Sequence, residues 1–550
     1  MTEALAGPRD AGSSSAAVRR YLAAIEAEPG RPPARDHGRP AVKRYPDAQR
    51  VVLPWPGPGR PALGDSTTER LSALLLGYGI RRFEELTSWS TAVLTAGTLP
   101  RADDPLRHLP GIASTHRTVP SGGNYHPGEL YLAWGGSPEI PAGLYHFDPT
   151  HHWLELVRAG DHTAELAPVL GGPPVTRHLL LAAWRPWKNA GKYRAFGYRL
   201  AMLDSGVLLG QLLVSPAVTA VHLDIDVPAA EALLGLDGTV ESVYAAAEVT
   251  FPGPESTGTA GGPPAPGTPA ASARGLELDR LELGQSDPAV AALHRQIRAG
   301  ARVRPAPGRH PAGEPAPAPA SACRPTDRYD RGPATPVPLP PVPDLDLAGA
   351  AVRRASSFNL APGLELSQLA GVLAAVTVPG SASPTGGTTR PGPLREIAEH
   401  PLRPSWWCQV AQVEGLTPGS YRYDPDRHAL WPVPGTGPRV AEVSRLNPSM
   451  ASAGAALFAV ADGFGPVEDL DPAAYHRLYL LTGVRVHLAC LAATAVTAGA
   501  RPLLGYDPAV VAEQLGLSAT QAPLMQILLA RPRAQAGLLT ARLTGGVSHA

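Results

Sequence analysis

Two short stretches of this 550-residue sequence combine residue types that suit ligand binding. The first is the run Pro120-Ser121-Gly122-Gly123-Asn124. Small residues in such a turn let the backbone approach a flat or anionic ligand closely, because no side chain stands in the way. An ordinary glycine-rich β-turn has the same composition, so this run alone does not establish a binding site.

The second stretch is basic and lies in the other half of the chain. It reads Arg353-Arg354-Ala355-Ser356. Two guanidinium groups and a hydroxyl can bind a phosphate dianion, since arginine offers a fork of N–H donors. A solvated basic start of a helix gives the same sequence, and both interpretations stay open.

Strands and helices with clear patterns must position these residues. Aromatic and aliphatic residues at 129–134 are typical of a buried strand, and 143–149 is typical of a turn followed by a strand. We expect a central strand at 179–184 and a closing strand near 243–249. A long helix is expected from about 200 to 213, and it carries Asp204 and Gly206.

The second half of the chain repeats motifs of the first in the same order. Residues 419–430 match 143–154, residues 384–388 match 120–124, and Tyr475 and Gly483 match Tyr198 and Gly206 at one common offset. Chance does not easily give such matches in one order. The pattern therefore predicts a tandem duplication.

Composition divides the chain into four parts. Residues 1–40 are rich in Gly, Pro, Ser and Arg, and we expect a flexible tail with a short helix at 16–28. Residues 41–252 and 346–545 carry the two domains, of which the second is a degenerate copy. Between them, 253–345 is dominated by Pro, Ala and Gly, which favours a linker with one helix at 289–298.

Net charge, apolar runs and cysteine spacing indicate which partners and which cellular compartment to expect. The chain has 48 basic and 48 acidic side chains, so net charge favours neither nucleic acid nor an anionic membrane as a partner. No apolar run reaches the roughly 18 residues of a membrane span, and no apolar N-terminal segment indicates a secretory signal. Cys323, Cys408 and Cys490 are widely spaced, so we expect no metal site and a reducing cytoplasm.

Taken together, these motifs resemble the McbC/SagB branch of the nitroreductase-like flavoproteins over residues 41–252 and, more weakly, 350–540. The resemblance implies an α+β nitroreductase-like fold, with a central, mostly antiparallel sheet flanked by helices. Such proteins are generally homodimers with flavin mononucleotide (FMN) at the interface. Two tandem copies would form that interface within one chain as an intrachain pseudo-dimer, and a further oligomer stays open.

The resemblance also implies the residues of the site. Lys192 and Tyr193 match a Lys-Tyr pair implicated in catalysis. Without the resemblance, a surface lysine beside a packed tyrosine would be the simpler interpretation. The basic stretch departs from the family pattern, because an alanine is inserted and the last arginine is absent. The residues expected to bind FMN are Pro120, Ser121, Gly122, Gly123, Asn124, Arg199, Arg353, Arg354 and Ser356.

The two halves differ at matching positions in a complementary way. The first half has no basic stretch, and its counterpart at 64–70 is acidic enough to disfavour phosphate. The second half has Asp469-Leu470 in place of the Lys-Tyr pair and His476 in place of Arg199. We therefore expect one complete FMN site per chain, while a degenerate second site stays open.

The resemblance implies oxidation of azoline rings in a peptide substrate to azoles, in the biosynthesis of ribosomally made peptide natural products (RiPPs). A lysine whose pKa is lowered by burial or by a nearby cation can take the acidic ring proton while the flavin accepts a hydride. A YcaO-type cyclodehydratase is a candidate partner. Three alternatives stay open: thiazoline oxidation on a nonribosomal peptide assembly line, NAD(P)H-dependent nitroreduction, and peptide binding without catalysis.

Overall fold

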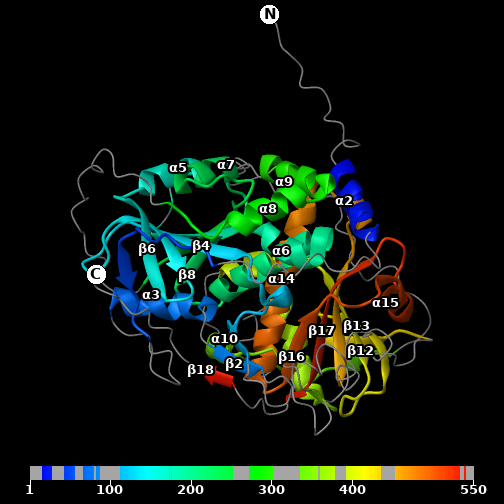
Figure 1. Cartoon of the computed structure of the whole chain (residues 1–550). Helices are drawn as coiled ribbons and strands as arrows, with labels where there is room; N and C mark the ends of the chain where they lie inside the picture. Colours follow the sequence, from blue (N-terminus) through cyan, green and yellow to red (C-terminus); the bar gives the residue numbers. More distant parts are fainter. Residues whose placement is uncertain are drawn as a thin grey trace, which may run out of the picture.

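The computed structural model shows two large sheets with helices packed around and between them (Figure 1). The residues that it describes are 15–27, 42–55, 66–79, 82–86, 112–172, 174, 176, 178–251, 272–300, 335–342, 344–356, 360–377, 392–434, 453–532 and 538–540.

A seven-stranded antiparallel sheet forms the first half. Its strands lie in the order β1 (Arg50–Val52), β6 (Trp153–Ala159), β5 (Gly143–Asp148), β4 (Gly128–Trp134), β7 (His178–Trp184), β9 (Ser242–Val249) and β8 (Val218–His222). Every residue of β4 is buried. The position of β7 between β4 and β9 confirms the central strand expected at 179–184.

The sheet of the second half repeats this order. It runs through β10 (Val337–Pro338), β14 (Ala429–Pro432), β13 (Gly419–Asp424), β12 (Ser405–Val410), β15 (Ala455–Ala461), β17 (Ala522–Pro532) and β11 (Leu360–Ala361). In addition, β16 (Gly499–Leu503) pairs with β17 as β8 pairs with β9. The shared order of strands confirms that the chain contains two copies of one fold.

Alternating residues of the strands pack into two different layers. In β4, Leu130 and Leu132 face the large central core, whereas Tyr131 and Ala133 face a second cluster. This second layer includes α5 (Thr163–Leu170) and α7 (Val227–Leu234), which lie over the outer face of the first sheet (Figure 1). The alternation follows from the two-residue side-chain period of a strand.

Two 24-residue helices, α6 (Ala190–Leu213) and α14 (Pro472–Ala495), pack against each other at the centre of the molecule (Figure 1). A Cβ built on Gly206 would lie 1.9 Å from the carbonyl oxygen of Leu480, and one on Gly483 would lie 2.1 Å from that of Leu203. Only glycine allows two backbones to come so close. The halves are therefore joined through matching positions of matching helices, as an intrachain pseudo-dimer.

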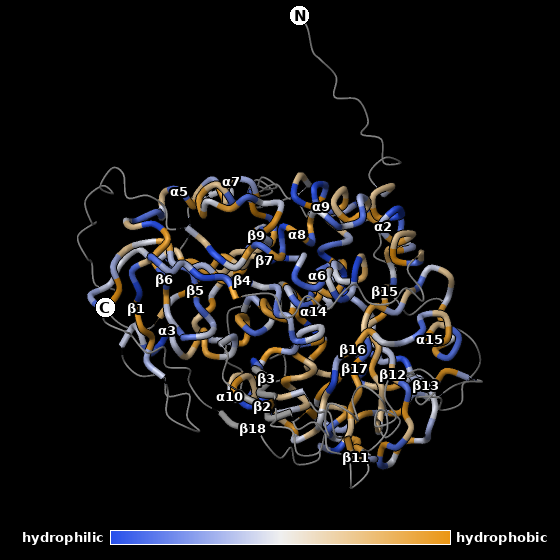
Figure 2. The backbone as a smooth tube through the Cα atoms, viewed as in Figure 1, coloured by the Kyte–Doolittle hydropathy of each residue, from blue (hydrophilic) through white to orange (hydrophobic). Residues whose placement is uncertain are grey.

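The helix α14 has the length and composition of a membrane span, with a mean hydropathy of 1.5 over its most apolar stretch. However, 89% of that stretch is buried inside the protein. Figure 2 shows apolar residues concentrated on the central helices and the inner strands. This is the pattern of a core helix.

Helices from the expected tail and linker also pack on the two halves. In α2 (Ala16–Glu26), Tyr21 is fully buried between Tyr198 and Tyr475. The segment 272–300 forms α8 (Glu277–Gln285) and α9 (Pro288–Gly300). The helix α9 was expected, whereas α8 was not. His294 of α9 is buried and shares a hydrogen bond of 2.9 Å with the hydroxyl of Tyr198.

The remaining helices and turns belong to one half or the other. They are α3 (Thr67–Leu75), α10 (Leu347–Arg353), α11 (Leu366–Ala375), α12 (Pro393–Glu399), α15 (Pro508–Leu515) and the 3₁₀ turns η1 (Leu76–Tyr78), η3 (Gly122–Asn124), η4 (Pro186–Asn189) and η7 (Val467–Asp469). A small sheet joins β18 (Leu538–Thr540) to β2 (Arg82–Leu86) and β3 (Ile112–His116). In this sheet the end of the second half pairs with the first half (Figure 1).

Candidate functional site

The glycine turn (residues 120–124) lies between β3 and β4 and packs on α6. Gly123 has a φ of +64°, a left-handed conformation that favours glycine. Asp204 of α6 fixes the turn, because its carboxylate accepts hydrogen bonds from Ser121 Oγ at 2.6 Å and from the backbone N–H of Gly122 at 3.1 Å. The Ser121 Oγ in turn accepts the backbone N–H of His126 at 2.8 Å.

Tyr193 lies directly over this turn. A Cβ built on Gly123 would stand 2.8 Å from the Tyr193 hydroxyl and 2.8 Å from the ring of Tyr125. The two tyrosine rings meet edge to face, with their centroids 6.3 Å apart. The structure thus brings Tyr193 and the glycine turn together, as expected of residues that share a site.

Tyr193 and Lys192 differ in their exposure. Burial, followed by the influence of Tyr125 and Asp204, raises the pKa of Tyr193 to about 12. The phenol is therefore protonated at neutral pH and acts as a hydrogen-bond donor. Lys192 is exposed, with Nζ 5.3 Å from the centroid of the Tyr193 ring. The burial that would favour a lysine base is thus not observed at Lys192.

The backbone around this pair has an unusual conformation. We expected the long helix to begin near residue 200, but α6 begins at Ala190 and includes Lys192 and Tyr193. Arg194 interrupts it with φ +51° and ψ −135°, a combination that is costly for a residue with a side chain. The first turn of α6 is therefore set at an angle of its own, which carries Tyr193 over the glycine turn.

Arg199 lies in the contact between the halves. The central carbon of its guanidinium stands 5.5 Å from the ring centroid of Tyr479 in the second half and 5.9 Å from that of Phe196. Its Nε is buried and has no hydrogen-bond partner in the described part of the chain. Arg199 thus belongs to the interface, where the expected site also lies.

In the basic stretch of the second half, the two adjacent arginines differ in direction: Arg354 points into the protein and Arg353 points outward. Arg354 is buried, and its Nε donates a hydrogen bond to the backbone carbonyl of Thr118, just before the glycine turn. Its Nη1 donates to Ser356 Oγ at 3.2 Å. Arg353 points elsewhere: its side chain is 55% exposed and lies 3.5 Å from the carboxylate of Asp346. The structure therefore brings Arg354 and Ser356, but not Arg353, toward the first half.

The site residues expected from the sequence did not include Arg117, His126 and Lys188, which are buried beside the same turn. Lys188 Nζ donates to the carbonyl oxygen of His126 at 2.9 Å. Burial, and then the charge of Arg185, lowers the pKa of Lys188 to about 7. Burial and the surrounding cations hold the pKa of His126 well below its usual value. What distinguishes these residues is their burial in the folded protein, and no spacing pattern in the sequence reveals that burial.

Asp204 is a second residue whose role was not expected, although its place on the long helix was. Burial raises the pKa of this carboxyl to about 7, in spite of hydrogen bonds from Ser121 and Gly122 that favour the ionised form. A carboxyl with such a pKa exchanges its proton near neutral pH. The glycine turn therefore rests on a group whose charge changes in the physiological range.

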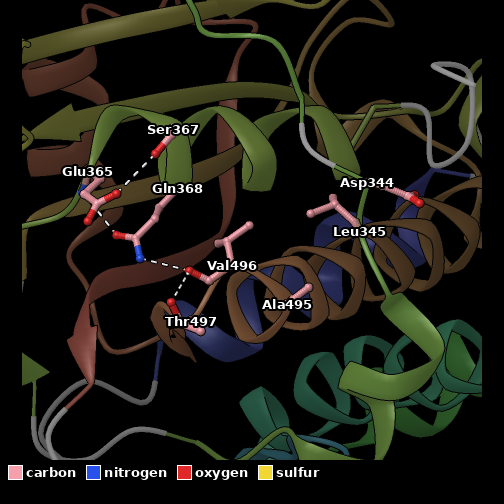
Figure 3. A pocket seen from close by; sticks show the side chains of 8 residues that line it. All are labelled: Asp344, Leu345, Glu365, Ser367, Gln368, Ala495, Val496 and Thr497. Atoms are coloured by element: carbon pink, nitrogen blue, oxygen red, sulfur yellow. Dashed lines mark hydrogen bonds between the residues drawn. The ribbon is translucent and has the colours of Figure 1, made fainter. Parts of the chain in front are cut away.

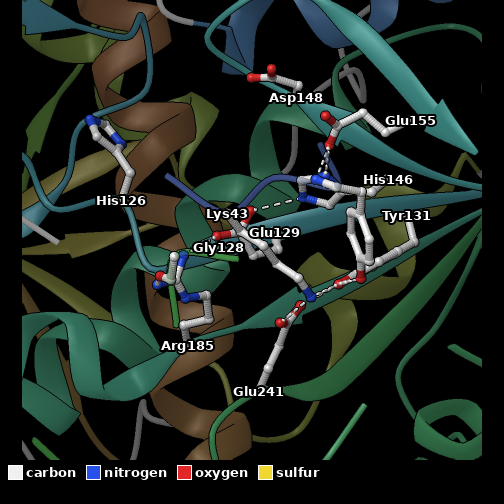
Figure 4. A network of polar contacts seen from close by, with 12 residues as sticks. Lys43, His126, Gly128, Glu129, Tyr131, His146, Asp148, Glu155, Arg185 and Glu241 are labelled. Atoms are coloured by element: carbon white, nitrogen blue, oxygen red, sulfur yellow. Dashed lines mark hydrogen bonds and ion pairs between the residues drawn. The ribbon is translucent and has the colours of Figure 1, made fainter. Parts of the chain in front are cut away.

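Behind the turn, a network of buried charged residues supports β4 (Figure 4). Glu129 accepts a hydrogen bond from Arg185 at 3.1 Å and contacts His146 at 3.3 Å. Burial alone would raise the pKa of Glu129, but His146 and the charges of Lys188 and Arg185 outweigh it and hold that pKa well below its usual value. Because Glu129 is ionised and bound on several sides, the strand that follows the turn is held rigidly.

The matching positions of the second half look different. Asp469 and Leu470 replace Lys192 and Tyr193, and Asp469 pairs with Arg19 of α2. His476 replaces Arg199; it is buried, and burial lowers its pKa to about 3. The repeated glycine-rich run, Pro384-Thr385-Gly386-Gly387-Thr388, lies outside the described residues.

A separate hollow of about 380 Å³ opens at the end of α14 (Figure 3). Its lining includes the carboxylates of Asp344 and Glu365 and the last residues of the helix, Ala495 and Val496. Carboxylates and the carbonyl end of a helix both favour cations. None of the expected site residues lines this hollow, and its charge does not suit an anionic cofactor.

Comparisons with known proteins bear on the fold. No family model matches the sequence. No curated protein matches it either. Among solved structures, one assigned as a nitroreductase from Anabaena variabilis has a TM-score of 0.66 at 18% identity and covers 94% of this chain and 99% of that chain.

Two further solved structures overlap with part of the chain. One, assigned as a nitroreductase from Ralstonia eutropha, has a TM-score of 0.25 at 19% identity over 37% of this chain and 97% of its own. The other belongs to the Escherichia coli microcin synthetase McbBCD complex with truncated pro-MccB17. It has a TM-score of 0.26 at 19% identity and covers 41% of this chain and 77% of that chain. The Anabaena match shows a nitroreductase-like fold over nearly the whole chain; a fold alone does not show an activity.

Proposed function

We propose that this protein is an FMN-dependent dehydrogenase that oxidises azoline rings of a peptide to azoles. The observation that carries the proposal is that Tyr193 and Arg354, from different halves, both contact the segment of the glycine turn. The nitroreductase-like fold supports a flavin-type oxidoreductase. The Lys192-Tyr193 pair, as a sequence motif, supports the McbC/SagB-type reaction within it.

The residues around the glycine turn fit FMN. Tyr193 and Tyr125 lie close to Gly123, which places aromatic rings beside the turn, and two nitrogens of buried Arg117 have no partner among the described residues. FMN would be held by the glycine turn, by Arg199 and by Arg354 with Ser356. When bound, FMN supplies the acceptor for the hydride that leaves the azoline ring.

The chain itself would supply the proton acceptor. The Cα–H of an azoline is acidic, because it lies next to a carbonyl and an imine. Lys192 is exposed, so a peptide can reach it, and we assign it the role of base. Tyr193, protonated because its pKa is about 12, would donate a hydrogen bond that orients the ring. The substrate would be made by a YcaO-type cyclodehydratase in a reducing cytoplasm.

The proposal is tested on the purified full-length chain. We expect a flavin absorbance spectrum, release of FMN on denaturation, and the loss of two hydrogens per ring from an azoline peptide by mass spectrometry. Turnover of nitroaromatics with NAD(P)H, without azoline oxidation, would favour a general reductase. A colourless protein that takes up no flavin would contradict both activities.

The stoichiometry of the cofactor follows from the difference between the halves. We predict about one FMN per chain, because the Lys-Tyr pair and the basic stretch each occur in one half only. The measurement is flavin released per chain, with protein concentration determined by amino-acid analysis. Two tightly bound FMN per chain would show that the second half keeps a working site.

A further inference from the structure

Arg117 is a buried cation for which the protein provides little compensation. It follows β3, three residues before the glycine turn, and is 7% exposed. Its guanidinium lies 4.4 Å from the ring centroid of Tyr78. Its Nε and Nη1 are buried and have no hydrogen-bond partner within the described ranges, which also contain no ion pair to Arg117. A buried unpaired charge is costly, so such a group normally meets an anion.

Two other buried cations lie around the same point. Lys188 donates a hydrogen bond to the carbonyl oxygen of His126, and Arg354 donates one to the carbonyl oxygen of Thr118, the residue after Arg117. Lys188 Nζ comes within 3.9 Å of Glu129. That carboxylate, however, already receives Arg185 at 3.1 Å. Among the described carboxylates, Glu129 is thus shared by Arg185 and Lys188, and none forms an ion pair with Arg117.

The other nearby carboxyl, that of Asp204, does not pair with Arg117 either. Asp204 is bound by Ser121 and Gly122, and it shares no described ion pair with Arg117, Lys188 or Arg354. The nearby phenol of Tyr78 donates to the carbonyl oxygen of Gly128 at 2.6 Å and carries no charge. A dianion is the ligand that would balance the charge of Arg117 beside these basic neighbours, whereas an oxidised flavin ring is neutral and would not.

We propose that Arg117 of the first half and Arg354 of the second together bind the phosphate monoester of FMN, and that Arg353 takes no part. This inference rests on the proposed function, because it names the residues that hold its cofactor. It differs from the sequence expectation, which placed both consecutive arginines on the phosphate. The phosphate would thus bridge the two halves, and a phosphodiester or an unphosphorylated flavin would bind less tightly.

The test compares FMN with riboflavin, which has the same ring but no phosphate. Full-length protein is stripped of flavin and titrated with each ligand by fluorescence quenching. In Arg117→Gln and Arg354→Gln we expect FMN affinity to fall by about 10- to 100-fold, because a charge-assisted hydrogen bond is lost. Riboflavin affinity should change by less than about twofold. Arg353→Gln, the matched control, should bind FMN as the wild type does.

Inorganic phosphate supplies an independent arm. In the wild type it should compete with FMN but not with riboflavin, and in Arg117→Gln the competition should weaken. Equal losses of FMN and riboflavin in Arg117→Gln would place the arginine on the ring and overturn the inference. So would unchanged FMN affinity in that variant, or a loss in Arg353→Gln as large as in Arg117→Gln.

Stability separates a binding role from a structural one. Arg117→Gln removes an unpaired buried charge, so the flavin-free variant should melt no lower than the wild type. Its gain in melting temperature with saturating FMN should be smaller. If this variant does not fold, Arg117→Lys keeps the charge but loses the fork, and FMN affinity should still fall while riboflavin affinity holds. Wild-type protein that binds neither flavin would instead contradict the proposed function itself.

Discussion

In the first half, α6 carries Lys192, Tyr193 and Arg199. In the second half, the matching positions hold Asp469, Leu470 and His476. The strand orders of the two sheets nevertheless agree, and the helices α6 and α14 both have 24 residues. The two copies therefore agree where backbones pack and differ where side chains would do chemistry. The residues that pack the backbones are needed for both copies to adopt the same fold. The residues that would do chemistry can differ between the copies without changing that fold.

The start of the long helix shows the same contrast at the level of the backbone. In the second half, α14 begins in a regular way: Asp471 accepts the backbone N–H of Ala474 at 2.9 Å as an N-cap, and Pro472 follows. In the first half the matching residue is Arg194, and the helix continues backward through it. At these positions the second half has the separate 3₁₀ turn η7, whereas in the first half the turn is continuous with α6 and carries the Lys-Tyr pair.

The largest predicted effect is the loss of turnover in Lys192→Ala. If Lys192 takes the azoline proton, its removal should lower the rate by about 10²- to 10⁴-fold, as is typical for a general base. The flavin absorbance should stay near that of the wild type, because the residues assigned to the cofactor lie elsewhere. The assay follows loss of two hydrogens per ring from an azoline peptide.

The matched control is Asp469→Ala in the second half. It occupies the position of Lys192 in the other copy but pairs with Arg19 of α2, so it should keep nearly full turnover. Full activity in Lys192→Ala would rule out the assigned base. Equal losses in both variants would mean that both halves contribute to chemistry, and the comparison between them would fail.

The next largest effect should be symmetric between the halves. In Gly206→Ala or Gly483→Ala, the new methyl group would lie 1.9 Å or 2.1 Å from a carbonyl oxygen of the facing helix. The helices must then move apart, which we expect to destabilise the protein by roughly 3 kcal/mol in either variant. Urea unfolding measures this, with the shift in midpoint as the readout.

A double variant and a control sharpen this prediction. Once α6 and α14 have separated, the second methyl group costs little, so Gly206→Ala with Gly483→Ala should cost clearly less than the sum. Gly284→Ala in α8 meets nothing within 4 Å and should stabilise the protein slightly, since alanine favours a helix. A large effect at only one of the two central glycines would contradict the pseudo-twofold contact.

Much of this fold could be predicted from local sequence patterns. The helix expected at 289–298 is present as α9, and the repeated motifs identified the duplication. These features depend on periodicity and on turn residues, which a single sequence displays. The helix α8 was missed because its stability comes from packing: Asp279 is buried against Arg185, which lies far away in sequence.

The site was less predictable for the same reason. The glycine turn and Tyr193 are recognisable motifs, and the structure brings them together. The separation of Arg353 from Arg354, two adjacent arginines, depends on how α10 ends against the first half. Likewise, nothing in the sequence around Arg117 distinguishes it from an exposed arginine. Long-range contacts decide which cations are buried, and one sequence does not contain them.

The smallest predicted effect concerns Asp204, whose counterpart in the second half is the apolar Leu481. Its pKa is raised from 3.8 to about 7 in the folded state, so folded protein holds a proton that the unfolded chain releases between these values. Stability of the wild type should therefore fall, relative to Asp204→Asn, as pH rises from about 4 to about 7. Asparagine can still accept the Gly122 N–H, so at pH 8 the variant should be more stable by about 1–2 kcal/mol after relaxation of the site.

Asp237→Asn is the control of opposite sign for this prediction. The pKa of Asp237 is lowered: burial alone would raise it, but hydrogen bonds from Thr239 and Val240 stabilise its ionised form. This exposed carboxylate thus adds stability that is present at neutral pH and lost as pH falls below about 4. Asp237→Asn should then be less stable than the wild type at pH 7, and this difference should narrow as pH falls below about 4. Urea unfolding of the three proteins from pH 3 to 8 measures both trends.

A constant difference between Asp204→Asn and the wild type across this range would contradict the prediction. It would show that the carboxyl beneath the glycine turn does not change its charge there, and that this position differs from Leu481 in hydrogen bonding alone.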